Sequence, residues 1–196
     1  MKNIVLILFV ILTAACQQES NFKIIGQLPD NQFNGETIYL VPIPERGVEW
    51  VDSTTIQNGQ FMIEGYADSS EIYVLRAQPL LRAMLQELLV VREPGVIMVN
   101  LGANSTAAGT ALNDSLQRWK AFKIANDKQV YMLNREYSAA DTIRKTAIKA
   151  QIDSLMVTGN SFYSGFTQNN QTNVVGRFVK NMLGDSFQSE QTKDRE

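Results

Sequence analysis

The sequence predicts an α+β chain, in which an N-terminal antiparallel β-sandwich of about seven strands precedes a C-terminal helical segment. Two observations predict this fold. From Phe22 to about Leu101, apolar and polar residues alternate and turn residues recur at short intervals, a pattern typical of short antiparallel strands. After Gly102, apolar residues recur at three- or four-residue steps, which is the helical period.

The first residues of the chain predict export and lipid attachment. Lys2 is followed by an apolar run from Ile4 to Leu12, by the small residues Thr13–Ala15, and then by Cys16. The run is shorter than the roughly 20 residues that a membrane span needs, and its layout is that of a secretory signal peptide. We therefore expect residues 1–15 to be a bacterial lipoprotein signal and Cys16 to accept the lipid. The alternative is an ordinary secreted protein with an incidental cysteine.

Residues 16–21 are expected to be a polar, lipidated tether, and residues 22–110 the sandwich domain. Asn58-Gly59 predicts a type I′ hairpin turn, because both residues tolerate positive φ. Pro94-Gly95 predicts a type II turn between the last two strands. The expected strands are Phe22–Leu28, Glu36–Val41, Glu49–Ile56, Gln60–Glu64, Glu71–Ala77, Leu85–Arg92 and Val96–Leu101.

Residues 111–184 are expected to form a helical, connector-like region. Thr110 is the predicted N-cap of its first helix, and Asp114 lies near the positive end of the helix dipole. A second helix is expected after Asp141, and the apolar residues between Phe162 and Leu183 predict one or two shorter helices. Residues 185–196 are a polar tail.

The composition excludes several classes of site. The chain has no histidine, which excludes Ser-His-Asp and Cys-His arrangements and histidine-ligated metals. Cys16 is its single cysteine, so a lipidated chain has no thiol for a disulfide, a CxxC pair or a metal. Without residues 1–15 the chain keeps 17 basic and 20 acidic side chains, which argues against a nucleic-acid partner. We expect no cofactor and no metal.

Polar residues that resemble catalytic groups have simpler expected roles. Asp52 and Ser53 are expected to end or turn a strand, since their side chains bond to nearby backbone. Glu93 beside Pro94 is expected to serve a turn, because no second carboxylate can be placed near it. Trp119 and Phe122 lie on a helical stripe and are expected to be core residues. A hydrolase using Asp, Glu or Ser therefore has no supporting constellation, and we expect a protein that is not an enzyme.

Seven short motifs follow one another in a characteristic order. They are Phe22–Gly26, Gly35–Leu40, Val51–Ser53, Gly59–Phe61, Glu93–Gly95, Gly109–Asp114 and Asn173–Gly176. Together they resemble the family called domain of unknown function 4369. This family is the N-terminal module of many envelope-anchored, thioredoxin-like proteins of Bacteroidetes. The resemblance covers roughly Asn21 to Asp114 and extends through the helical region to about Leu183.

In that family a thioredoxin fold of the thiol:disulfide interchange type, with a CxxC motif, usually follows the connector. The present sequence has no second cysteine, so those catalytic residues have no position here. The resemblance implies that the connector of longer relatives approaches their thioredoxin domain. Phe162, Tyr163 and Phe166 are therefore a candidate interaction surface. The alternative is that these aromatic side chains pack back on the helices.

These observations lead to one functional hypothesis and one alternative. The first is a non-catalytic lipoprotein of the cell envelope that acts as a binding or interaction module. Its membrane partner is reached through the lipid on Cys16, with the periplasmic side of the outer membrane as the preferred location. The alternative is an accessory component of a thioredoxin-like thiol:disulfide oxidoreductase, whose redox domain is supplied by a separate protein partner.

Overall fold

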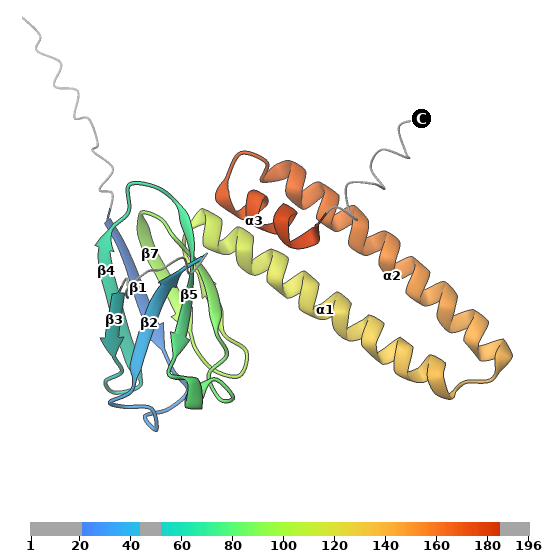
Figure 1. Ribbon diagram of the computed structural model, residues 1–196, viewed down its shortest axis with the longest axis horizontal. Helices are drawn as coiled ribbons and strands as arrows, with labels where there is room; N and C mark the ends of the chain where they lie inside the picture. The colour runs from blue at the N-terminus through green and yellow to red at the C-terminus, as the bar shows by residue number, and fades with distance from the viewer. Residues whose placement is uncertain (1–20, 44–51, 185–196) are drawn as a thin grey trace, which may run out of the picture.

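A computed structural model describes residues 21–43 and 52–184. It confirms the α+β fold, with two four-stranded sheets followed by three helices (Figure 1). The sheet that we call sheet A has the strand order β4 (Gln60–Tyr66), β1 (Asn21–Gln27), β7 (Gly95–Asn100), β8 (Thr106–Ala108). The sheet that we call sheet B has the order β3 (Asp52–Thr55), β2 (Thr37–Pro42), β5 (Glu71–Ala77), β6 (Leu88–Arg92).

The strands depart from the expected pattern in three respects. The three-residue strand β8 was not predicted, and the segment from Gln78 to Glu87 holds a short 3-10 helix, η1 (Pro79–Leu81), before β6 begins at Leu88. The sandwich is also not wholly antiparallel, because β1 and β7 are parallel neighbours. The chain crosses from sheet B to sheet A between β6 and β7, which brings β7 beside β1 in the same direction. Residues 49–51 of the predicted third strand lie outside the described residues.

The two predicted turns have the expected glycine geometry. Asn58 and Gly59 have φ of 52° and 67°, as a type I′ turn requires. The strands around this turn, β3 and β4, join different sheets after the single bridge between Gln57 and Gln60. Gly95 also has a positive φ, 122°, and it too stands at a crossing between the sheets. These turns therefore connect the two layers of the sandwich.

Phenylalanine–glycine pairs fix the register of β1 against β4. Phe22 lies opposite Gly65, and Gly26 lies opposite Phe61. Both rings are buried, and each covers its glycine: a Cβ on Gly26 would lie 1.9 Å from the Phe61 ring, and one on Gly65 3.0 Å from the Phe22 ring. A one-residue slip would turn these rings outward. The two pairs consequently specify both the alignment and the inward face of this strand pair.

The helical part forms a long antiparallel hairpin and a short third helix. Helix α1 (Ala111–Ala139) and helix α2 (Thr142–Asn169) extend away from the sandwich, and α3 (Val174–Leu183) lies beside them at the sandwich end (Figure 1). The carboxylate of Asp141 accepts the Arg144 N–H at 2.8 Å and caps α2. Among residues 21–43 and 52–184, no helix combines the length and apolar character needed to cross a bilayer.

The expectation of one or two shorter helices between Phe162 and Leu183 is confirmed for α3 and wrong for the residues before it. The residues from Phe162 to Phe166 do not begin a new short helix but continue α2, which is 28 residues long. Gly159 and Gly165 lower the helical propensity of this stretch, yet Gly159 lies where α2 meets Asn126 of α1 and is buried. Tertiary packing therefore overrides the local signal for a break.

The base of the helical part packs on sheet B at strands β5 and β6. Ile72 of β5 and Val91 of β6 contribute to a second apolar cluster beneath the helices, with Leu116 and Trp119 of α1 and residues of α2 and α3. The main core lies between the sheets. The helical segment is thus a third layer on the β5–β6 edge rather than a separate body.

We predict that Gly26→Ala destabilises the protein by about 1–3 kcal/mol, because the added methyl group overlaps the Phe61 ring inside a packed core. Urea-induced unfolding measures the change. The control is Gly165→Ala, whose Cβ meets nothing within 4 Å and should leave stability equal or higher. Adding Phe61→Leu to Gly26→Ala should restore part of the loss, and an undiminished stability of Gly26→Ala would refute this account of the register.

Candidate functional site: the joint and the helical hairpin

The N-terminus of helix α1 is capped by the buried carboxylate of Glu93, from another part of the chain. Oε1 of Glu93 accepts the Thr110 hydroxyl at 2.6 Å and the backbone N–H groups of Leu112 and Asn113 at 2.9 and 3.2 Å. Thr110 is the N-cap residue, as predicted, but its own side chain makes no capping bond to α1. Glu93 supplies that function, and its charge lies at the positive end of the helix dipole.

The side chain of Asn113 pairs with the edge of sheet B as a further strand would. Its Oδ1 accepts the Val91 N–H at 2.9 Å, and its Nδ2 donates to the Val91 carbonyl at 2.7 Å. Nδ2 also donates to the Thr110 hydroxyl at 2.8 Å. β6 is the outermost strand of sheet B, and both Val91 and Asn113 are buried. The amide of Asn113 therefore satisfies two backbone groups that would otherwise lack partners. We call Glu93, Thr110 and Asn113 together the joint.

Other side chains of α1 bind the neighbouring strand and loop. Oε1 of Gln117 accepts the Ala107 N–H at 3.3 Å in β8. Nζ of Lys120 donates to the Ser105 carbonyl, and burial lowers the pKa of this lysine below its ordinary value. The first three turns of α1 are thus bonded to both sheets, which fixes the direction in which the helix leaves the sandwich.

A second polar cluster holds the turn between α2 and α3. Oδ1 of Asn170 accepts the Ser115 hydroxyl of α1 at 3.0 Å and the Asn173 amide at 2.9 Å. Asn173 in turn caps α3 by accepting the Gly176 N–H at 3.0 Å. A Cβ on Gly176 would lie 2.0 Å from the Asn170 carbonyl, so only glycine allows this close approach.

These polar groups bond to one another and to neighbouring backbone. The Glu93 carboxylate accepts its bonds from α1 and the N-cap threonine, and Asn113 and Asn170 bond to backbone or to other amides. In the part of the chain that the structure describes, no three carboxylate or cysteine side chains gather as metal ligands would. Asp52 and Ser53 were expected to end or turn a strand, but they lie in β3, the edge strand of sheet B, paired with Leu40 and Tyr39.

The predicted aromatic residues lie together in one cluster at the base of the hairpin. The Phe162 ring stacks on Phe122 of α1 at 3.7 Å and on Phe166 at 5.9 Å between centroids. Tyr163 meets Phe122 edge to face, and burial together with nearby Asp127 raises the pKa of its hydroxyl. Phe166 is only 5% exposed, whereas Phe162 and Tyr163 are half-buried. The structure therefore has these side chains packed on the helices, and only Phe162 and Tyr163 offer accessible surface.

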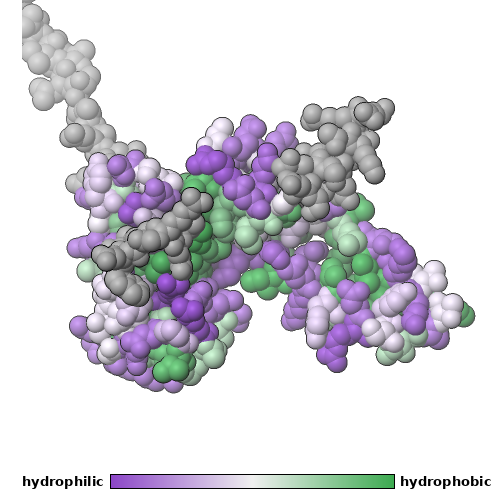
Figure 2. All heavy atoms as spheres, viewed as in Figure 1, coloured by the Kyte–Doolittle hydropathy of each residue, from purple (hydrophilic) through white to green (hydrophobic). Residues whose placement is uncertain are grey.

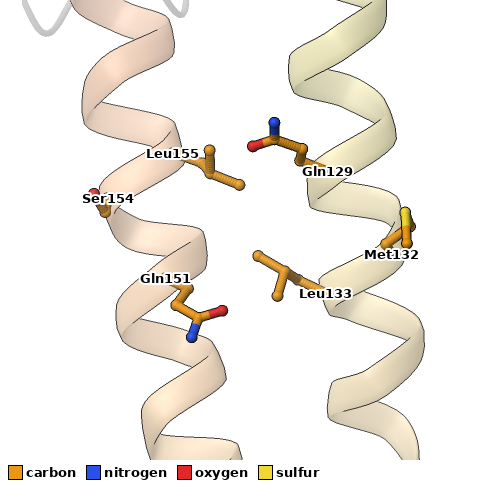
Figure 3. Close-up of a pocket in the computed structure, with 6 residues that line it drawn as sticks. All are labelled: Gln129, Met132, Leu133, Gln151, Ser154 and Leu155. Carbon is orange, nitrogen blue, oxygen red and sulfur yellow. The ribbon is translucent and has the colours of Figure 1, made fainter.

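The hairpin is closed at its tip and open in its middle. At the tip, the Arg144 guanidinium pairs with the Glu136 carboxylate, and Ile148 is fully buried. Further toward the sandwich, a groove of about 450 Å³ separates the helices. Figure 3 shows Gln129 and Leu133 of α1 and Gln151 and Leu155 of α2 pointing into the space between them. Met132 and Ser154 line its rim (Figure 3).

Asn113 and Asn170, whose side chains hold the helices in place, were not identified from the sequence. Both occur at helix ends next to turn residues, where asparagine usually bonds to its own backbone. Their actual partners are 22 and 55 positions away, Val91 for Asn113 and Ser115 for Asn170. The only sequence signal for Asn113 was its place in Gly109–Asp114, one of the motifs that carry the family resemblance. Cys16 lies outside the described residues.

We predict that Asn113→Ala destabilises the protein by about 2 kcal/mol or more, because it leaves the buried N–H and carbonyl of Val91 unpaired. Thermal and urea-induced unfolding measure the loss. The matched control is Asn134→Ala, an exposed asparagine on the same helix, which should change stability by less than about 0.5 kcal/mol. Equal effects of the two substitutions would contradict the structural role of the joint.

Comparison with known proteins finds a matching protein family. Residues 22–116 match the model of the family described as Domain of unknown function (DUF4369). No curated protein and no solved structure matches the chain. The matched segment contains all eight strands and the first turn of α1, including the complete joint. The match to the DUF4369 family over residues 22–116 confirms the resemblance that the motifs indicated.

Proposed function

We propose that the protein is a lipid-anchored, non-catalytic interaction module of the bacterial cell envelope, and that its helical hairpin contacts a protein partner. The observation that carries this proposal is the open middle of the hairpin. There the groove between α1 and α2 is lined by Met132, Leu133 and Leu155, and no described element covers it. Figure 2 shows apolar residues on this part of the molecule, interrupted by polar ones.

The joint supports the same proposal in physical terms. A binding surface on a projecting element is specific only if that element is held in a fixed direction. The bonds from α1 to Val91, Ala107 and Ser105 supply this constraint at the base of the hairpin. A partner that inserts an apolar side chain between Leu133 and Leu155 would bury surface that the isolated chain leaves exposed.

The anchor is proposed from the N-terminal residues. The apolar run from Ile4 to Leu12, the small residues before Cys16 and the short polar stretch after it support diacylglycerol attachment at this cysteine. Several acyl chains on one residue exceed the single-chain threshold of marginal membrane binding. The periplasmic side of the outer membrane is the proposed location.

We predict that Cys16→Ala abolishes lipidation and moves the protein from the membrane fraction to the soluble fraction, because the thiol is the acyl acceptor. Metabolic labelling with a radioactive fatty acid, followed by fractionation, measures both effects. Ser20→Ala, in the expected tether, is the control and should remain labelled. Unchanged labelling of Cys16→Ala would refute the lipoprotein assignment.

We predict that Met132→Asp weakens partner binding by at least about tenfold, since it replaces an apolar side chain at the rim of the groove with a charge. Asn134→Asp adds the same charge to the same helix without being a groove residue and is the matched control. Crosslinked complexes from detergent-solubilised envelopes measure binding by both variants. Equal recovery with the two variants would contradict the groove as the binding surface.

The same recovery identifies the class of partner. A partner with a CxxC motif would establish the accessory role in a thiol:disulfide oxidoreductase system. A glycan or an outer-membrane receptor in its place would exclude that role.

A further inference from the structure

We propose that the outward face of sheet A rests on the headgroup region of the lipid bilayer. This inference rests on the proposed lipidation of Cys16, and it adds an orientation and a second membrane contact that the anchor alone does not give. It is carried by three observations on the described residues: an apolar row across the sheet, its neutral surroundings, and the position at which the chain enters β1.

The strand register aligns apolar side chains across sheet A. Met62 of β4 lies opposite Ile25 of β1, Ile25 lies beside Met98 of β7, and Met98 lies opposite Ala108 of β8. Met62 and Met98 are 47% and 49% exposed. These four side chains alternate with the buried residues of their strands, so they share the outward face. The helices leave most of this face open: their apolar cluster takes its strand residues from sheet B, and α1 reaches sheet A at its edge strand β8.

The charges and aromatic residues around this row suit a membrane surface. Nζ of Lys23 lies 3.3 Å from the Glu64 carboxylate on the neighbouring strand, so the pair carries no net charge. Val96 lies beside Lys23 and is 47% exposed. Tyr66, at the end of β4, is 64% exposed, and tyrosine is a residue enriched at membrane–water interfaces. The neighbouring row of Gln60, Gln27 and Asn100 is polar but uncharged. A face without net charge and with an apolar row across it is repelled by neither neutral nor anionic headgroups.

The length of chain before β1 holds this face near the lipid. Five positions separate Cys16 from Asn21, the first residue of β1, and a chain of this length spans at most about 18 Å. Ile25 is four residues further along the strand, about 13 Å from Asn21. The chain enters sheet A at Asn21, the first residue of β1, which lies next to Tyr66 of β4. The tether therefore reaches the bilayer when the sheet lies along the bilayer surface.

A fluorescent label placed on the sheet tests the contact. The acylated Cys16 has no free thiol, so Met98→Cys supplies one labelling position on sheet A, and Ser53→Cys supplies the control on the exposed edge of sheet B. The full-length lipidated protein is reconstituted into neutral phosphatidylcholine vesicles that carry bromine near the headgroup end of their acyl chains. We expect quenching of the label at position 98 to exceed that at position 53 by at least about twofold.

Two further measurements separate the possible failures. Mass spectrometry of the purified protein first establishes the acyl groups, and an unacylated Cys16 would overturn the proposed function itself. An acylated protein with equal quenching at positions 98 and 53 would overturn only the orientation, and would leave the apolar row to a protein partner. Met62→Cys reports on the same row from a second strand, and it should be quenched as strongly as Met98→Cys.

Discussion

Val91, on the outermost strand of sheet B, can be buried because a side chain supplies its missing hydrogen-bond partners. Backbone N–H and carbonyl groups that lose water must find other partners, and Val91 is fully buried on β6. The amide of Asn113 supplies both partners, while Glu93 receives the first N–H groups of α1. These two side chains thus supply hydrogen-bond partners to the edge of a strand and to the start of a helix. The rest of the helical part depends on this arrangement.

The position of the other helices follows from that of α1. Its bonds to both sheets set its direction, and α2 returns along it through the stacked rings of Phe122 and Phe162. Asn170 then bonds to Ser115 of α1 and turns the chain into α3, which packs on Ile72 of sheet B. The hairpin is therefore tightly packed near the sandwich, less filled in its middle and closed again at its tip. The open middle is why we place the proposed partner contact in the groove and not in the aromatic cluster.

The elements with local signals could be predicted from the sequence. Asn58-Gly59 specified its turn, and Thr110 marked the start of α1. Features that depend on distant contacts could not. Strand β8 has three residues, too few to show a period, and nothing local reveals that β7 pairs in parallel with β1. At the candidate site, Phe162, Tyr163 and Phe166 were identified and their packing on the helices was the stated alternative, whereas Glu93 was assigned to a turn although it caps a helix.

Amide hydrogen exchange of Val91 tests the central claim most directly. The N–H of this residue is bonded to a side chain and to no neighbouring strand, so its protection reports on the joint alone. The account predicts that Val91 exchanges only through global unfolding, as slowly as core strand residues such as Ile24. Exchange of Val91 as fast as that of Ser53, at the exposed edge of the same sheet, would show that Asn113 does not hold α1 to the sandwich.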